Sequence, residues 1–453
     1  MKEKRILWLV CLGVLTACVP QPRYLNQPLT DAEREQPVPA RFETHDRNDD
    51  ITVILTFSGG GTRAAAFSYG VMRGLRDIDV DINSRHSTSL LSLVDVISSV
   101  SGGSFTAAYY GLFGEQLFTD FEADFLKLKV QSYLTRQLFI NPINWFRFMS
   151  GQYNRSELTA QYYQRAIFGG KTFADMRMDA PVVMINATDI ATGAGFSFTE
   201  EHFRWLCSDL SEFPVGKAVA ASSAVPVLFS PVLVRNHPGC QPYEFQLSRV
   251  HEDVRFKHQA LKLRQFRKKH KYPYLHLVDG GVADNLGVRA LLNQIYEQDN
   301  DFWQALKAYR LTNTKKVLFV VVNAAAVLDE GISQSTDTPS LSQTINAVTT
   351  IQSQNYNADT LDLLELSVAQ WTDQVREGRC AEFFKAGCDD FEFYVTELNF
   401  SHIGEPHASE LAAIETALQL PETEVDRLIR AGEQLVRESE VIAQFVNQVS
   451  EQP

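Results

Sequence analysis

The feature that most constrains this fold is one stretch of small and β-branched residues, Val94-Asp95-Val96-Ile97-Ser98-Ser99-Val100-Ser101-Gly102-Gly103-Ser104. Its first seven residues predict a buried β-strand, because β-branched apolar side chains pack well inside a sheet. The small residues that follow, with Ala107, Ala108 and Leu112 beyond them, predict a helix packed closely behind the strand. Ser101 is therefore expected at a tight strand-to-helix corner.

A serine at such a corner projects its hydroxyl from the sheet edge, beside a helix N-terminus whose free N–H groups favour developing negative charge. That placement suits a nucleophile. The local pattern is Ser-x-Ser-x-Gly, however, with Ser99 where the usual nucleophile motif has a glycine. Taken alone, the motif fits a structural serine–glycine turn equally well.

A second stretch supplies candidate donors for an oxyanion. Residues 51–57 form an apolar run that predicts a strand, and it leads through Ser58 into Gly59, Gly60 and Gly61 before a helical pattern begins. Consecutive glycines leave their N–H groups uncovered and tolerate unusual φ values, as an oxyanion-binding loop requires. Nucleotide binding is the alternative, but no Gly-Lys-Ser/Thr follows and the spacing is not that of a dinucleotide motif.

A third stretch carries a candidate base. Residues 275–278 form a short apolar strand that delivers Asp279 onto a turn made by Gly280 and Gly281. An aspartate at the end of a strand is frequently only a turn former. Its assignment therefore depends on the other two stretches.

Together the three stretches resemble the patatin-like phospholipase family. The family's Gly-Gly-Gly-x-Arg loop, serine corner and Asp-Gly-Gly/Ala turn are matched in that order at residues 59–63, at Ser101 and at residues 279–281. Further family-like stretches lie at residues 186–198 and 220–231, so the resemblance covers roughly residues 50 to 330. Ser99 is the departure, and it affects mainly the conformation of the turn.

The resemblance implies an α/β fold of the patatin-like, three-layer α/β/α type with a mostly parallel central sheet. It also implies a serine acyl hydrolase that cleaves lipid esters, as a phospholipase A or lysophospholipase does, without a cofactor or a metal. The residues to which it assigns roles are the catalytic Ser101 and Asp279, the oxyanion-hole residues Gly59, Gly60 and Gly61, and the loop-supporting Arg63.

Two alternatives remain open. An α/β-hydrolase triad has the chain order Ser, Asp, His, which Ser101, Asp279 and either His402 or His407 satisfy. A non-catalytic lipoprotein that uses this fold to bind lipid or a protein is the other alternative. Ser58 favours a dyad over the triad, since lipase-type oxyanion loops place a histidine there.

The N-terminus predicts export. Residues 1–5 are Met-Lys-Glu-Lys-Arg, and residues 6–19 are largely apolar but too short to span a membrane comfortably. Residues 15–18, Leu-Thr-Ala-Cys, look like a bacterial lipoprotein box that ends a signal peptide over residues 1–17, with lipidation of Cys18; an ordinary signal peptide cut near Ala17 is the alternative. Val19, in place of a retention aspartate, favours the outer membrane of a Gram-negative cell envelope.

Proline content and the family resemblance together predict how the chain is organised. Residues 18–49 contain five prolines and predict a tether. The resemblance implies that residues 50–330 form the catalytic core, and residues 331–453 are expected to form a mostly helical extension packed on that core. The net charge of −13 argues against nucleic acid as a partner. Membrane lipid is the expected substrate, and protein partners are not indicated.

Three further features have two interpretations each. The aromatic-rich residues 117–148 predict helices that either line an acyl-chain groove or belong to the core. The basic residues 264–271 predict either a contact with anionic headgroups or a solvated helix face. Asn186 and Asp189, at the end of a predicted strand, either support the site or form a turn.

Four cysteines remain outside the signal peptide and Cys18: Cys207, Cys240, Cys380 and Cys388. An even number in an exported chain permits disulfides, and pairing of neighbours is one of three possible connectivities. Buried free thiols are the alternative.

The lipoprotein box leads to a direct test. We expect Cys18→Ala to leave the precursor without an acyl group and mislocalised, because the acyl chains are what hold such a protein at a membrane. Fractionation and labelling with a radioactive fatty acid measure both effects. Unchanged label and unchanged membrane association in the variant would refute the assignment.

Overall fold

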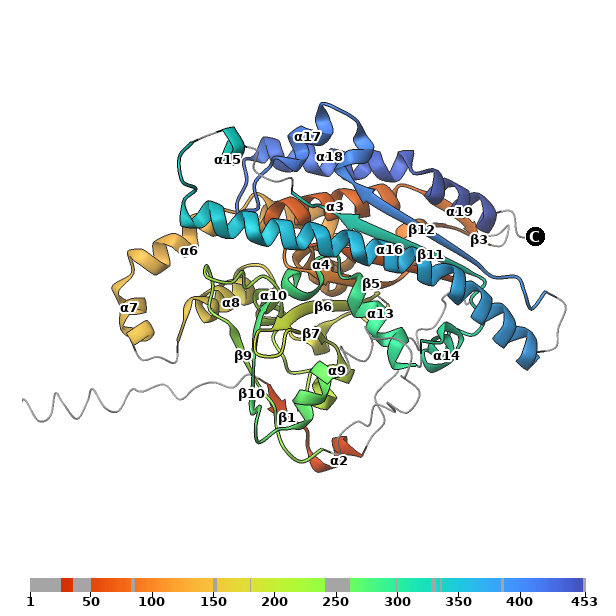
Figure 1. Ribbon diagram of the computed structural model, residues 1–453, viewed down its shortest axis with the longest axis horizontal. Coiled ribbons are helices and arrows are strands. Elements are labelled where there is room, and N and C mark those ends of the chain that lie inside the picture. The colour runs from red at the N-terminus through yellow and green to blue at the C-terminus, as the bar shows by residue number, and fades with distance from the viewer. Residues whose placement is uncertain are drawn as a thin grey trace, which may run out of the picture.

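The computed structural model describes residues 26–35, 50–82, 86–149, 153–179, 181–240, 261–298, 300–326, 331–334, 336–383 and 387–450. At its centre lies an eight-stranded sheet with the strand order β12-β11-β2-β5-β6-β10-β9, and β7 also pairs with β6 (Figure 1). These strands are β2 (Ile51–Phe57), β5 (Val94–Val100), β6 (Val182–Asp189), β7 (Ala194–Phe198), β9 (Val232–Arg235), β10 (Tyr274–Asp279), β11 (Lys316–Asn323) and β12 (Glu392–Asn399).

The sheet is mostly parallel. Strands β12, β11, β2, β5 and β6 run in the same direction, whereas β7 and β10 are antiparallel to β6 and β9 is antiparallel to β10. Parallel strands are buried on both faces and therefore have nearly continuous apolar sequences. Strands β2 and β11 have such sequences, and β5 combines four apolar residues with Asp95 and two small serines, all of them buried.

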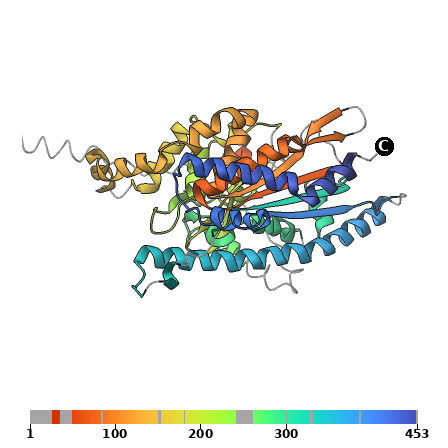
Figure 2. The ribbon, with the colours of Figure 1, turned by 90° about the horizontal axis from the view of Figure 1, so that it is seen from above.

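Helices cover both faces of the sheet. Helices α3 (Gly61–Arg76) and α18 (Glu422–Glu438) lie on one side and the long α16 (Leu341–Phe383) on the other, as Figure 2 shows. Alternate residues of β11 divide between the two cores: Val317 and Phe319 pack with α16, and Leu318 and Val320 with α3 and α18. The three-layer α/β/α architecture expected from the sequence is confirmed.

The C-terminal segment is part of this architecture. Strand β12 pairs in parallel with β11 over its whole length and forms one edge of the central sheet. Helix α18 buries Val425, Leu428 and Leu435, spaced at three to seven residues, against α3. Within the predicted helical extension, α18 ends at Glu438, and α19 (Glu440–Ser450) begins directly after Ser439.

Part of the predicted tether is docked on the body. Within residues 18–49, strand β1 (Gln27–Pro28) pairs with β8 (Ser208–Asp209), and the Asn26 side chain bonds the backbone N–H and C=O of Arg235 at 3.0 and 2.6 Å. The short helix α2 (Asp31–Arg34) follows. We call residues 26–35 the strap. The proline-rich composition did not predict that the strap would pair with a strand. The predicted lipidation site, Cys18, lies outside the described residues.

The aromatic-rich region divides into a buried and an exposed half. Phe121, Phe125 and Val130 are fully buried in the core, whereas Phe139 and Phe146 are 70% and 74% exposed. The core interpretation therefore holds for the first half only. None of the described helices is both long enough and apolar enough to cross a membrane.

One lysine of the predicted basic face over residues 264–271 is bonded to the protein backbone and does not face solvent freely. Lys269 Nζ donates to the backbone carbonyls of Trp205 and His237 at 2.9 and 2.5 Å, and burial lowers its pKa to about 8. This lysine supports the loop that follows β9. It is not available to contact a headgroup.

The four cysteines outside the N-terminal region form two pairs. Cys207 is joined to Cys240, with Cα atoms 5.4 Å apart, and Cys380 to Cys388, with Cα atoms 4.9 Å apart. Both Cα distances lie within the range that a disulfide spans. This is the pairing of neighbours, one of the three connectivities that the sequence allows.

Peptide mapping tests this connectivity. We expect mass spectrometry of the oxidised protein to show Cys380 linked to Cys388, because the loop between them is short and its ends are already close. Alkylation of four free thiols under denaturing, non-reducing conditions would contradict it.

Candidate active site

Strand β6 aligns the two strands that carry the predicted catalytic residues. Strand β5 pairs with β6 up to Val100, opposite Asn186, and β10 pairs with β6 from Asp279, opposite Ala187. Strand β7 occupies the other edge of β6, so β5 and β10 share one edge. Because β10 runs antiparallel, the C-terminal ends of β5 and β10 meet there. Ser101 and Asp279 are thereby brought together.

Ser101 lies at the predicted strand-to-helix corner. Its backbone has φ 49° and ψ −116°, a conformation that residues with a side chain rarely adopt, and α4 (Gly102–Phe113) begins directly after it. The Ser101 hydroxyl donates to Asp279 Oδ2 at 2.8 Å. The sequence prediction that these two side chains act together thus has the required geometry.

Ser222 holds this strained corner in place. The Ser101 N–H donates to Ser222 Oγ at 2.8 Å, and Ser222 Oγ in turn donates to the backbone oxygen of Asn186 at 2.6 Å. The backbone oxygen of Ser222 accepts the N–H of Gly280 at 3.1 Å. Ser222, at the end of α10 (Val215–Ser222), therefore bonds both the nucleophile corner and the aspartate turn. The sequence offered no signal that distinguishes it from Ser223.

Asp279 is buried, and its carboxylate has two hydrogen-bond donors. Ser101 bonds one oxygen, and the N–H of Gly281 bonds the other at 2.9 Å. Burial raises the pKa of Asp279 to about 6, while the two hydrogen bonds oppose that rise. A carboxylate with this pKa is a stronger base than an exposed one and is still largely ionised at neutral pH.

The glycine loop differs from the prediction at one residue. The N–H of Gly59 donates to the backbone oxygen of Asn285 at 3.0 Å, so it is already occupied and is not available to an oxyanion. Gly60 and Gly61 have φ values of 143° and 58°, and neither N–H has an acceptor among the described residues. The expected set of three donors is therefore reduced to Gly60 and Gly61.

Gly102 is a further candidate donor that the sequence prediction missed. It is the first residue of α4, where the N–H groups have no partner within the helix. A Cβ atom at Gly102 would lie 1.9 Å from the backbone oxygen of Gly61, so the glycine loop and the corner are in direct contact. The motif itself was the available signal, because the residue after a corner nucleophile commonly contributes to the oxyanion hole.

Arg63 supports the loop from inside the protein. Its Nε donates to the backbone oxygen of Ala324 at 3.0 Å, and its guanidinium also bonds the backbone oxygen of Ile414. Burial lowers the pKa of Arg63 to about 10, which leaves it charged at neutral pH. The side chain thus ties the start of α3 to the end of β11 and to the C-terminal segment.

The polar residues at the end of β6 have different roles. Asn186 Nδ2 donates to Ser98 Oγ at 2.8 Å and to the backbone oxygen of Ser99 at 3.1 Å, which fixes the strand just before the corner. Asp189 accepts the N–H groups of His276 and Thr192, each at 3.1 Å, and forms a turn. Asn186 therefore supports the site, and Asp189 does not contact it.

No described histidine contacts the Ser101–Asp279 pair. His402 and His407, the triad candidates, are exposed near the start of the C-terminal helices. His202 is half-buried, its Nδ1 accepts the N–H of Ser197 at 2.7 Å, and desolvation lowers its pKa to about 3. Among the described residues, the geometry thus provides a carboxylate, and no imidazole, beside the serine.

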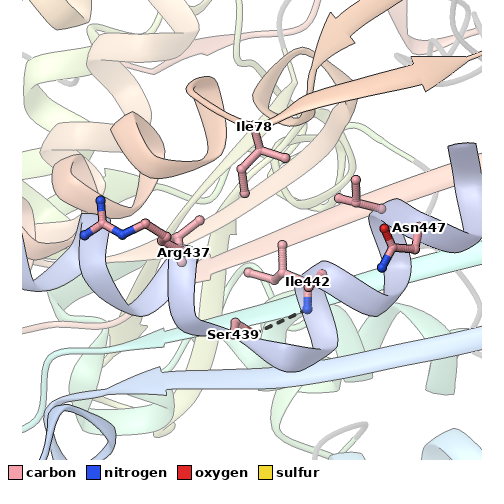
Figure 3. A pocket seen from close by; sticks show the side chains of 8 residues that line it. Ile78, Arg437, Ser439, Ile442 and Asn447 are labelled. Atoms are coloured by element: carbon pink, nitrogen blue, oxygen red, sulfur yellow. Dashed lines mark hydrogen bonds between the residues drawn. The ribbon is translucent and has the colours of Figure 1, made fainter.

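A hollow of about 230 Å³ lies elsewhere in the molecule (Figure 3). It is lined by Ile78 and by residues of α18 and α19, among them Arg437 and Ile442. None of its lining residues belongs to the elements that carry Ser101 or Asp279. We therefore assign it no part in the site.

The chain is similar to known phospholipases. A sequence model of the family described as patatin-like phospholipase matches residues 55–292, just over half of the chain. No curated protein matches the sequence. Among solved structures, human GIVD cytosolic phospholipase A2 is similar, with a TM-score of 0.46, 12% identity, and coverage of 95% of this chain and 69% of that one.

The same human protein in complex with methyl gamma-linolenyl fluorophosphonate gives a TM-score of 0.40 and 13% identity, with coverage of 95% and 66%. The family match includes the glycine loop from Leu55 onward, the serine corner and the aspartate turn. At the level of the family this places the chain among lipid hydrolases. The chain belongs to the patatin-like phospholipase family.

Proposed function

We propose that the chain hydrolyses carboxylic esters of membrane lipids, as a phospholipase A or lysophospholipase, with Ser101 as nucleophile and Asp279 as base. The observation that carries this proposal is the 2.8 Å hydrogen bond from Ser101 Oγ to Asp279 Oδ2 at a buried corner. Uncovered N–H groups of the adjoining glycine loop support it. A purely binding protein has no need for a strained serine beside a buried carboxylate.

In the first half-reaction, Ser101 Oγ attacks the ester carbonyl carbon while its proton passes to Asp279 Oδ2. A base within hydrogen-bond distance is required, because the serine hydroxyl is a weak nucleophile at neutral pH. The N–H groups of Gly60, Gly61 and Gly102 then stabilise the oxyanion of the tetrahedral intermediate. Loss of one such donor typically lowers the rate by about 10²–10³.

The intermediate collapses when Asp279 returns its proton to the oxygen of the leaving alcohol. The ester C–O bond breaks, the alcohol departs, and the acyl group remains on Ser101 Oγ. In the second half-reaction Asp279 takes a proton from water as that water attacks the acyl carbon. The proton then returns to Ser101 Oγ, and the fatty acid is released.

Location at a membrane completes the proposal. We propose that cleavage before Cys18 and lipidation of that residue anchor the enzyme at the outer membrane of a Gram-negative cell. The lipoprotein box supports this, since several acyl chains anchor a protein firmly. The two disulfides are consistent with an oxidising compartment.

The buried carboxylate leads to a prediction about stability. Because its folded-state pKa of about 6 exceeds the ordinary aspartate value of 3.8, the folded chain binds more protons between these pH values, and the unfolding free energy falls as pH rises through that window. At pH 8 the buried charge costs up to about 3 kcal/mol. We therefore expect Asp279→Asn to be more stable than the parent protein at pH 8 and nearly equal to it at pH 4.

Urea unfolding of both proteins at the two pH values measures this difference. Asn keeps the size of Asp, and its oxygen can accept from the N–H of Gly281 while its NH2 donates to Ser101 Oγ, as a protonated carboxyl would, so the comparison isolates the charge. A stability difference that is the same at pH 4 and pH 8 would show that Asp279 is not a buried, titrating carboxylate.

The catalytic assignment predicts which variants lose activity. Ser101→Ala and Asp279→Asn should each lower ester hydrolysis by about 10⁴-fold, the scale on which serine hydrolases lose activity without nucleophile or acid partner. His276→Ala, His402→Ala and His407→Ala should keep most activity, because none of these rings contacts the pair. Release of fatty acid from defined phospholipids and from a soluble short-chain ester is the measurement.

Identification of the lipid products also shows which ester bond is cleaved. A folded histidine variant that loses as much activity as Ser101→Ala would instead identify that histidine as the base of a triad. Full activity of Ser101→Ala would refute the hydrolase mechanism altogether.

A further inference from the structure

Helices α6 (Val130–Phe139) and α7 (Pro142–Met149) form an arm that projects from one end of the body in both Figure 1 and Figure 2. We call residues 130–149 the arm. It carries large apolar side chains that are 50–82% exposed, which is unusual so close together on a protein surface. These are Phe139, Ile140, Ile143, Trp145, Phe146 and Met149.

The exposed side chains of α7 lie on one face. At 100° per residue, Ile143, Trp145, Phe146 and Met149 fall within roughly half of the helix circumference. Asn144 points the other way and is buried. The apolar face is therefore turned outward, and the polar residue inward.

Hydrogen bonds fix the arm in this orientation. Asn144 Nδ2 donates to the backbone oxygen of Gln137 at 3.1 Å, and Trp145 Nε1 donates to that of Leu138 at 3.0 Å. The N–H of Ile143 donates to Asn141 Oδ1 at 3.0 Å. Polar groups are thus satisfied within the arm while its apolar surface faces out, the reverse of a helix pair that is built for water.

The charge around the arm is opposite to that of the whole chain. Residues 125–156 contain no aspartate or glutamate, although the chain has a net charge of −13. Four cationic residues lie in this segment besides Lys127, which is paired with Glu122 and Asp426: Lys129, Arg136, Arg147 and Arg155. Such a surface is complementary to anionic headgroups. It disfavours the packing of two arms from separate copies, since that would bring like charges together.

At each end of the arm, the chain bonds a segment that contacts the glycine loop or the aspartate turn of the active site. At one end, Ser132 Oγ donates to Gln419 Oε1 at 3.0 Å, two residues from Ala417, whose backbone oxygen accepts the N–H of Thr62 beside the glycine loop. Beyond the other end, at the first residue of α8 (Arg155–Ala166), Arg155 donates to the backbone oxygen of Val227 at 3.2 Å.

Val227 lies three residues beyond Ala224, whose backbone oxygen accepts the N–H of Asp279 at 2.9 Å. Val227 and Leu228 are themselves more than 60% exposed. The loop that contacts the aspartate turn thus carries exposed apolar side chains of its own.

We propose that the arm docks on a bilayer that contains anionic phospholipid. Its apolar face enters the boundary between headgroups and acyl chains, and the lysines and arginines lie at the phosphates, as in interfacial amphipathic helices. Trp145 is suited to this depth, because its ring is apolar and its N–H is already bonded. Docking brings the loops around Ser101 to the lipid surface. It requires neither ester hydrolysis nor an acyl group on Cys18.

Quenching of Trp145 fluorescence by brominated phospholipid tests this locally. The full chain carries Ser101→Ala throughout, so that no lipid is consumed, and the signal of a Trp145→Phe counterpart is subtracted. A local signal is needed because an acyl anchor would hold every variant on the vesicle. We expect strong quenching in vesicles of phosphatidylcholine with phosphatidylglycerol, and much weaker quenching in phosphatidylcholine alone.

Matched variants separate the arm from general surface effects. The double variant Ile143→Ser with Phe146→Ser should raise the lipid concentration at half-maximal quenching by about tenfold or more, since two large side chains no longer enter the lipid. Leu366→Ser on α16 is the control: Leu366 is 74% exposed, as is Phe146, but lies on a different helix. Lys129→Gln and Arg136→Gln should each raise that lipid concentration by about fivefold, and only when the vesicles contain anionic lipid.

Two results would overturn the proposal: no quenching of Trp145 by either lipid, or a shift from dimer to monomer in Ile143→Ser with Phe146→Ser by sedimentation. The second result would show that the arm is an interface between copies. In the Ser101-containing chain, the same double variant should keep its activity on a soluble ester. Failure of the hydrolase proposal would appear in that assay, and failure of docking in the quenching.

Discussion

The site depends on the way in which two strands of opposite direction share one edge of β6. Strand β5 leaves that edge at Val100 and β10 reaches it at Asp279, so the nucleophile and the base come from segments far apart in the chain but adjacent in register. Side chains alternate along a strand, and a shift of β10 by one residue would turn Asp279 to the other face of the sheet. The hydrogen bonds from Ser222 to Asn186 and from Gly280 to Ser222 hold this register at the point where it matters.

The same arrangement explains why the core stores unfavourable energy at the site. A serine with positive φ and a buried carboxylate each destabilise the folded chain, and both occur within one hydrogen bond of each other. The surrounding layers offset this cost, since β5 is buried along its entire length and α4 is buried almost throughout. Arg63 adds a rigid support between the glycine loop and the C-terminal segment. Stability in the layers thus permits strain at the corner.

The sequence was sufficient to predict the three-layer fold and to identify Ser101 and Asp279, because both residues follow or end predicted strands and belong to short motifs in a fixed order. It could not show that the N–H of Gly59 is occupied, since its partner Asn285 is distant in the chain and bonds through its backbone. Nor could aromatic content separate the buried Phe121 from the exposed Phe146, because a helix that faces lipid and one that faces a core have similar compositions. Ser222 went unassigned for a related reason: its importance comes from three backbone contacts and not from a motif.

The docked strap changes how far a lipid anchor would let this domain travel. Only residues 19–25 separate Cys18 from Asn26, which is bonded to Arg235. A fully extended segment of this length reaches at most about 29 Å, less than the thickness of a bilayer with its headgroups. A tether that was free to residue 49 would reach several times farther. An acylated chain would therefore be confined to the leaflet that holds its anchor, and its choice of substrate would be set by which lipids lie within that radius.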